Sequence, residues 1–289
     1  MLVTTHSRSN DFTAVLILFC IPVPKLPIYS AAFLGDTGNV VVSGRRKFFY
    51  IYDAAAGKLD HIPEIVGRQE KSLEYCRPSP DGRTLAFGGN DGFIILFDAR
   101  SKQWIADLKL NGNVRTIAFS PEGDRIVASG SDGDVYRWDM KSRKCVERFS
   151  NLDGTSSTSL ALSSRHLAVG AKSGVVNLFS DIHSSFGKSS SFDTAEAQRT
   201  PIKSIMNLHS AIHSTCFNSD GQILAIATRN DQSGLKLMHV PTATVYANWP
   251  TLNTPLGYVW SMDFSSDSRF LAIGNDKGKC LLYNLKHYS

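Results

Sequence analysis

Short runs in which apolar and polar residues alternate recur along the chain, and a turn rich in Ser, Pro, Asp or Gly joins the two runs of each pair. Six such segments align with one another, beginning at Tyr29, Leu73, Arg115, Thr158, His213 and Trp260. A period of two is typical of half-buried β-strands, and turn residues between two runs indicate a hairpin. In the second segment, Pro80, Asp81 and Gly82 supply a fixed φ, a local hydrogen-bond acceptor and a residue that tolerates positive φ. The pattern predicts an all-β protein built from a repeated unit.

A third apolar run follows each pair and ends in a large residue followed by a polar one. The six dipeptides are Tyr52-Asp53, Phe97-Asp98, Trp138-Asp139, Phe179-Ser180, Met238-His239 and Tyr283-Asn284, at successive spacings of 45, 41, 41, 59 and 45 residues. Four of these five spacings match the ~40–45 residues of a four-stranded propeller blade. Blades stacked around an axis bury the sheet faces that one blade cannot bury alone. We therefore expect a β-propeller in which the large residue of each dipeptide packs between blades.

The longest spacing is explained by an insertion in the fourth repeat. Residues 181–200 are rich in Ser and poor in large apolar side chains, which is typical of a mobile loop. We expect this loop between the third and fourth strands of its repeat, either as a surface extension or as a partner-binding segment. The repeats then occupy residues 28–70, 71–111, 112–152, 153–209, 210–255 and 256–289.

Residues 1–27 fit the repeat pattern poorly. Within them, residues 14–21 are apolar and predict a single strand, which would either close the last blade or remain from an incomplete seventh blade. The run is far shorter than the ~20 residues of a membrane-spanning helix. A signal peptide is disfavoured because Asp11 precedes the run and no small-residue cleavage site follows it. We expect six complete repeats plus an incomplete amino-terminal strand or blade, and a partner chain could pair with the strand edges left open there.

Composition and residue spacing give no indication of an active site. Hydrophobic residues make up 42% and charged residues 20%, which places the chain among folded soluble proteins. Five cysteines lie far apart, without the spacing of a disulfide framework or a metal knuckle, so a reducing compartment fits best. The eight histidines lack zinc-binding spacing, no Gly-x-Ser-x-Gly elbow is present, and no Lys-Ser or Lys-Thr follows the glycines at 88–92. We therefore expect a protein that is not an enzyme, with no catalytic residue, metal, cofactor or small-molecule substrate and no membrane association.

The dipeptide Trp138-Asp139, preceded by the run Ser129-Gly130-Ser131-Asp132-Gly133, resembles a blade of the WD-repeat family. The resemblance covers residues 28–289 and implies a propeller, for which the family pattern is seven blades. In that family an Asp in the turn between the second and third strands orients a network of His, Ser and Trp. The residues at its position here are Asp91, Asp132, Asp231 and Asp276. The Gly-His dipeptide that opens many repeats of the family occurs nowhere in this chain, so we expect an incomplete network and more dependence on packing.

Four longer segments carry a closer resemblance. Residues 44–53, 66–74, 201–208 and 274–289 resemble, in the same order, the WD-repeat domain of a family of small-subunit processome subunits associated with U-three small nucleolar RNA. The resemblance implies a non-catalytic scaffold in the nucleus and nucleolus that acts in maturation of precursor small-subunit ribosomal RNA. It also implies contacts with other WD-repeat subunits, with the U-three small nucleolar ribonucleoprotein and with the precursor RNA. Members carry a long charged extension and a further first blade, so the chain resembles an amino-terminally truncated member.

Basic residues provide the candidate binding site. The formal charge of +5 is mild, but cations gather in turns and links that we expect at one end of the ring. They are Arg45, Arg46 and Lys47 in the first repeat, Arg68 and Lys71 in the following link, and Lys277 and Lys279 in the last repeat. Since the first and last repeats are neighbours in a ring, we expect one arc that binds phosphates or acidic protein surfaces. The alternative is a solvated charged rim.

A second function remains open at this point. Residues 126–141 partly resemble the box by which some WD-repeat proteins dock onto the adaptor of a cullin ubiquitin ligase. Arg137 stands where the box prefers an apolar residue, and Lys141 where it prefers Arg. The alternative hypothesis is therefore a substrate receptor for a cullin-type ubiquitin ligase.

Overall fold

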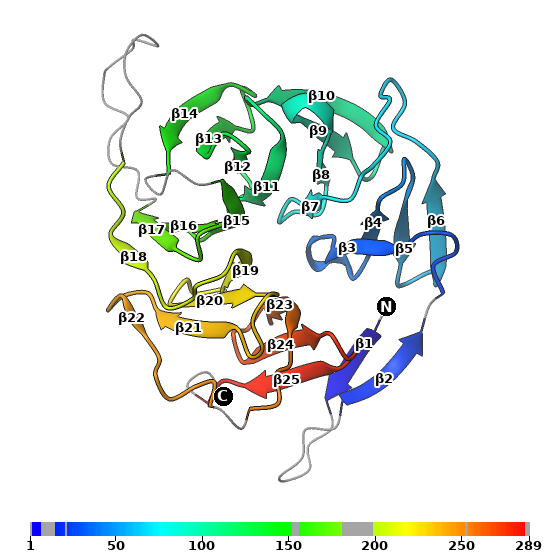
Figure 1. The fold of residues 1–289 in the computed structure, drawn as a ribbon. Coiled ribbons are helices and arrows are strands. Elements are labelled where there is room, and N and C mark those ends of the chain that lie inside the picture. Colours follow the sequence, from blue (N-terminus) through cyan, green and yellow to red (C-terminus); the bar gives the residue numbers. More distant parts are fainter. Residues whose placement is uncertain are drawn as a thin grey trace.

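The chain folds as antiparallel β-sheets arranged in a ring around a central opening (Figure 1). The computed structural model describes residues 2–6, 15–20, 22–151, 156–180, 199–251 and 254–286. Within these ranges the secondary structure consists of 25 strands and two short 3-10 turns, η1 (Gly35–Thr37) and η2 (Asn90–Gly92). The predicted all-β propeller is confirmed. None of the described segments is a helix with the length and apolarity needed to cross a membrane.

Five of the sheets are four-stranded blades whose strands follow one another in sequence from the centre outwards. Blade 1 contains β3 (Ile28–Phe33), β4 (Val40–Gly44), β5 (Phe49–Asp53) and β6 (Lys58–Ile62), and blade 2 contains β7 (Cys76–Pro78), β8 (Thr84–Gly88), β9 (Phe93–Asp98) and β10 (Gln103–Lys109). Blade 3 contains β11 (Val114–Phe119), β12 (Arg125–Gly130), β13 (Asp134–Asp139) and β14 (Cys145–Ser150), and blade 4 contains β15 (Ser157–Leu162), β16 (His166–Ala171), β17 (Val176–Ser180) and β18 (Lys203–Ile205). Blade 5 contains β19 (Ile212–Phe217), β20 (Ile223–Thr228), β21 (Leu235–His239) and β22 (Thr244–Val245).

The sixth blade and the amino terminus depart from this plan. Blade 6 has three strands, β23 (Val259–Phe264), β24 (Phe270–Asn275) and β25 (Cys280–Asn284). Where we expected a single strand over residues 14–21, the structure has a hairpin in which β1 (Leu2–His6) pairs with β2 (Val15–Cys20). The physical reason is that a lone strand leaves both edges unpaired, and Leu2–His6 supplies a partner. Figure 1 shows this hairpin between blade 6 and blade 1, at a seventh position of the ring.

The Asp of the repeat dipeptide holds the hairpin that follows it. The Asp98 Oδ1 atom accepts hydrogen bonds from the backbone N–H groups of Arg100, at 2.8 Å, and Ser101, at 3.0 Å. Asp53 and Asp139 accept backbone N–H bonds two or three residues ahead in the same way. The Ser101 bond is the main reason that the pKa of Asp98 lies below its ordinary value. In these three dipeptides the Asp is therefore a turn residue.

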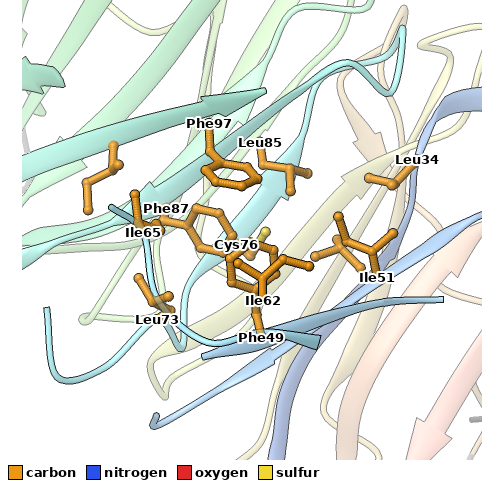
Figure 2. Close-up of a cluster of buried hydrophobic side chains, with 12 residues drawn as sticks. Leu34, Phe49, Ile51, Ile62, Ile65, Leu73, Cys76, Leu85, Phe87 and Phe97 are labelled. Carbon is orange, nitrogen blue, oxygen red and sulfur yellow. The ribbon is translucent and has the colours of Figure 1, made fainter. Parts of the chain in front are cut away.

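The large residue of five of the six dipeptides packs between blades, whereas Tyr52 packs within blade 1 and against the segment before it. Trp138 is only 2% exposed and stacks on Tyr136, with ring centres 5.7 Å apart. Phe97 joins Phe49 and Phe87 in the cluster that fills the space between blades 1 and 2 (Figure 2). Phe179 and Met238 are likewise buried, whereas Tyr52 and Tyr283 are half-buried. The two half-buried residues belong to blades 1 and 6, the blades that flank the hairpin.

The insertion of the fourth repeat lies where the spacing predicts it. Strand β17 ends at Ser180 and β18 begins at Lys203, so the extra residues separate the third and fourth strands of blade 4. Residues 181–198, which make up most of the predicted loop, lie outside the described residues. Its role as a surface extension or a partner-binding segment stays a prediction.

Replacing Trp138 by Ala is expected to lower the free energy of unfolding by about 3–5 kcal/mol, because a large buried side chain leaves a cavity. Urea unfolding followed by circular dichroism measures the loss. The control is Trp104→Ala, since Trp104 is exposed and its removal deletes one hydrogen bond to Asp107, a cost of about 1 kcal/mol. Equal losses for the two variants would contradict packing of Trp138 between blades.

Candidate partner-binding face

One end of the ring carries all the cations predicted to bind a partner. Because neighbouring strands are antiparallel, the turns between second and third strands emerge at the same end as the links between blades. We call this end the link face and define it by the turns at residues 45–48, 89–92, 131–133, 172–175, 229–234 and 276–279 together with those links.

Five of the seven predicted cations line one cavity of about 500 Å³ on the link face, between the β4–β5 turn and the link from β6 to β7. We call it the first hollow. Its basic lining residues are Arg45, Arg46, Lys47, Arg68 and Lys71. Phe48, Ile65 and Leu73 add apolar surface, and the carboxylates of Glu64 and Glu70 lie in the same wall. The sequence prediction that these cations gather is supported by this geometry.

Two of these cations have exposed carboxylate partners. The Arg45 Nε atom lies 2.6 Å from Glu74, and its guanidinium stands 4.5 Å from the centre of the Tyr29 ring. The hydrogen bond to Glu74 is the main reason that the pKa of Arg45 is raised. The Lys47 Nζ atom lies 3.0 Å from Glu64. Ion pairs this exposed are weak, so both cations can exchange their partner for a phosphate or another carboxylate.

Arg68 is held inside the protein. Its guanidinium pairs with Glu70 at 2.5 Å and with Asp107 on β10 at 2.7 Å, and it stacks on the Phe93 ring at 5.0 Å. The side chain is 16% exposed. These contacts fasten the link between blades 1 and 2 to the outer strand of blade 2. Arg68 therefore has a structural role, and its predicted contact with a partner stays a prediction.

Arg46 and Lys71 differ from the other three cations. Both are exposed, and within the part of the chain that the structure describes neither forms an ion pair. Their charge is available to an incoming anion without displacing a carboxylate. They are the strongest candidates in the first hollow.

The two remaining cations line a different cavity, of about 310 Å³, which we call the second hollow. Lys277 and Lys279 lie there beside Asn275, whose Oδ1 atom accepts their backbone N–H bonds at 3.1 and 2.9 Å. Both side chains are exposed and unpaired among the described residues. The expected single arc is not formed, because the β1–β2 hairpin lies between blades 6 and 1 and separates the two groups (Figure 1).

The aspartates of the second-to-third-strand turns make only part of the WD-repeat network. Asp132 accepts a hydrogen bond from the Tyr136 hydroxyl at 2.8 Å. Burial and then this carboxylate raise the pKa of Tyr136 to about 12. Asp231 accepts from Ser210 at 2.7 Å, and Asp276 accepts from the Tyr258 backbone N–H at 3.0 Å. At Asp91 the backbone carbonyl, and not the carboxylate, accepts a hydrogen bond from the Lys109 ammonium group.

Among the described residues, the central opening provides no recognisable catalytic set. Asp263 is the one carboxylate on the six innermost strands as the structure describes them. Desolvation by the surrounding protein raises its pKa, and the hydrogen bond from the Phe264 backbone N–H and the positive charge of Arg77 act in the opposite direction. One carboxylate provides neither the pair that glycoside hydrolysis uses nor a nucleophile with its base. No three His, Cys, Asp or Glu residues of the described ranges gather as metal ligands.

Two aromatic residues on the link face were not predicted from the sequence. Tyr29 and Trp260 are each 53% exposed, and each has an arginine stacked on its ring, Arg45 at 4.5 Å and Arg229 at 5.0 Å. The only sequence signal was a large aromatic at the start of an innermost strand. That signal is ambiguous, because aromatic residues in such strands are usually buried.

Comparison with known proteins agrees with this geometry. The family model described as WD domain, G-beta repeat matches residues 105–139 and 250–284. The chain is a WD-repeat β-propeller. It is also similar along most of its length to proteins named U3 small nucleolar RNA-associated protein 18 or its homologue, so the closer resemblance seen in the sequence is confirmed.

Three of these relatives illustrate the extent of the similarity. The Arabidopsis thaliana homologue is 45% identical over 264 residues, covering 91% of this chain and 46% of the relative. The Homo sapiens homologue is 37% identical over 271 residues, with 92% and 47% covered. The Saccharomyces cerevisiae protein is 27% identical over 324 residues, with 97% and 53% covered. This WD-repeat chain spans about half the length of the curated relatives it matches.

Replacing Arg68 by Ala is expected to lower the free energy of unfolding by about 3 kcal/mol, because two poorly solvated carboxylates lose their partner. The loss for Arg68→Lys should lie between zero and the loss for Arg68→Ala. A lysine keeps the charge, but its ammonium group lacks the planar guanidinium that donates to both carboxylates at once. Urea unfolding measures both variants. The control is Lys47→Ala, which removes an exposed ion pair and should cost about 0.5 kcal/mol or less. If Arg68→Ala costs no more than this control, the structural role of Arg68 is wrong.

Proposed function

We propose that this WD-repeat chain is a non-catalytic scaffold subunit of the small-subunit processome that acts in maturation of precursor small-subunit ribosomal RNA. The observation that carries the proposal is its similarity, across about nine-tenths of its length, to proteins named for association with U3 small nucleolar RNA. Its partners are then other WD-repeat subunits, the U-three small nucleolar ribonucleoprotein and the precursor RNA. Its location is the nucleolus within the nucleus.

The geometry supports a role in assembly rather than in catalysis. The innermost strands supply one isolated carboxylate, Asp263, whereas the link face supplies two hollows with exposed cations. A ring of packed blades holds these surfaces at fixed positions. Several modest contacts made at once by a rigid body raise the overall affinity through effective concentration. Binding therefore needs no single deep pocket.

Four cations are the best candidates for contact with a partner. Arg46, Lys71, Lys277 and Lys279 are exposed on the link face and have no ion-pair partner among the described residues. Phosphates of RNA and acidic side chains of proteins are both anions that such residues bind. Arg45 and Lys47 can add to them after releasing Glu74 and Glu64.

The alternative, a ubiquitin ligase receptor, gains no support from the structure. Arg137, at a position where the docking box prefers an apolar residue, is buried in blade 3 and lies 3.4 Å from Glu147. This buried, ion-paired arginine has a structural role within blade 3. It does not present the apolar contact of that box.

Charge reversal of the four cations, R46E/K71E/K277E/K279E, is expected to reduce co-purification of precursor ribosomal RNA and U-three RNA roughly ten-fold or more, because phosphate contacts dominate such affinities. The tagged chain would be expressed in Arabidopsis thaliana cells and the bound RNA quantified. The melting temperature should remain close to that of the unaltered chain, since all four side chains are exposed.

The matched control for this variant is R100E/K141E/K144E/R165E. It makes the same change in charge with four exposed cations from turns at the opposite end of the ring. We expect this control to co-purify with the RNAs as well as the unaltered chain does. Equal losses for the two variants, or no loss for either, would overturn the assignment of the link face.

A further inference from the structure

The first strands of five blades are interrupted at the same place by one extra residue. In blade 1, Ile28 pairs with Gly44 and Ser30 with Ser43, so Tyr29 has no partner across the sheet. In blade 6, Trp260 is left out between paired neighbours in the same way. The corresponding residues of the other interrupted strands are Arg115, Thr158 and His213. We call these five residues the mouth ring, because they lie where the innermost strands begin, at the link face of the central opening.

A bulge of this kind re-aims the side chain of the extra residue. In four of these strands at least one neighbour of the extra residue is buried, as for Val259 beside Trp260 and Ile212 beside His213, whereas Ile28 beside Tyr29 is itself exposed. The mouth-ring residues themselves are exposed, with Thr158 half-buried. The bulges therefore leave these side chains outside the inter-blade core, at the link end of the innermost strands.

Two members of the mouth ring are aromatic residues, and an arginine stacks on one face of each ring. The Arg45 guanidinium covers one side of Tyr29 and bonds its hydroxyl at 2.7 Å. The Arg229 guanidinium covers one side of Trp260 and donates to its backbone carbonyl at 3.2 and 3.0 Å. About half of each aromatic side chain remains accessible to solvent. Each ring is held in place by its arginine and keeps surface on which a further planar group can stack.

The surroundings of both aromatic rings are basic. Arg115 of the mouth ring is exposed and forms no ion pair within the described residues. The first hollow, with Arg46 and Lys71, adjoins Arg45, and the second hollow, with Lys277 and Lys279, includes Gly257 near the start of β23. The link face of blades 1 and 6 therefore carries both exposed aromatic rings and unpaired cations.

We propose that the mouth ring binds single-stranded RNA, with bases stacking on Tyr29 and Trp260 and phosphates held by Arg115 and the cations of the two hollows. Base stacking on aromatic side chains combined with a basic path for the backbone is the recognition mode of single-stranded nucleic acids. A duplex does not fit, because its bases are already stacked on one another. A protein partner with acidic side chains is the competing occupant, and the experiments below separate it from RNA. The inference rests on the proposed function for the choice of RNA over DNA.

The test is fluorescence anisotropy with the purified full chain and a labelled single-stranded RNA of about 12 nucleotides, within the range of known site sizes. Trp260→Ala and Tyr29→Ala are each expected to raise Kd about ten-fold, the loss of one stacked base. Trp260→Phe and Tyr29→Phe should retain most of the affinity. The matched control is Tyr246→Ala, since Tyr246 is a partly exposed aromatic that contacts His239 beside the outer strand β22. This control should bind RNA with unchanged Kd.

Two further readouts separate stacking from simple charge attraction. An RNA duplex of the same length should bind more weakly than the single strand, and its affinity should not respond to Trp260→Ala. Arg115→Ala should weaken binding of all sequences alike and reduce the slope of log K against log salt by about one. Circular dichroism melts confirm that the variants stay folded.

Unchanged RNA affinity in folded Trp260→Ala and Tyr29→Ala variants would overturn the inference. So would loss of protein subunits from these variants with RNA affinity intact, because the mouth ring would then be a protein interface. A chain that co-purifies with precursor RNA but has no RNA affinity of its own refutes this inference alone. A chain that binds single-stranded RNA but never joins the particle refutes the proposed function alone.

Discussion

Packing of one blade against the next is the interaction on which the rest of this structure depends. A twisted sheet of four strands has two apolar faces and cannot bury either without a neighbour. Here Phe49 of blade 1 meets Phe87 and Phe97 of blade 2 (Figure 2), and Phe149 of blade 3 meets Phe179 of blade 4. Because these contacts hold the ring together, the turns and links at its ends are free to carry residues chosen for binding.

The regular packing ends at blades 1 and 6, and the candidate surfaces lie on the same two blades. The repeat residues Tyr52 and Tyr283 are only half-buried there, and blade 6 has three strands in the part of the chain that the structure describes. Both hollows and both arginine-backed aromatics, Tyr29 and Trp260, belong to these blades or to the links that adjoin them. The part of the ring with the least regular packing thus carries both hollows and both arginine-backed rings. This coincidence is what connects the fold to the proposed assembly role.

Much of the fold could be predicted because it is encoded locally. The spacing of the dipeptides predicts the blades, and the Asp of Phe97-Asp98 caps the turn that follows it within three residues. The site was harder to predict, because its contacts join residues far apart in sequence. Arg68 looked like a binding cation, yet one of its two carboxylate partners, Asp107, lies 39 residues away on the outer strand of blade 2. The bulge that exposes Trp260 depends on how two strands pair. The alternation of apolar and polar residues along one strand does not reveal that pairing.

The amino-terminal hairpin is a second feature that the local sequence pattern did not predict. The apolar run at 14–21 indicated a strand, but its partner is another short strand that precedes it. Placing that hairpin at a seventh position also separates the two groups of cations that ring closure alone would have joined (Figure 1). The most direct test of the account is hydrogen exchange, by mass spectrometry, of the free chain and of the chain within its isolated particle. We expect new protection at residues 45–48, 257–261 and 276–279 on the link face. Protection confined to the opposite turns, at residues 99–102 and 140–144, would contradict it.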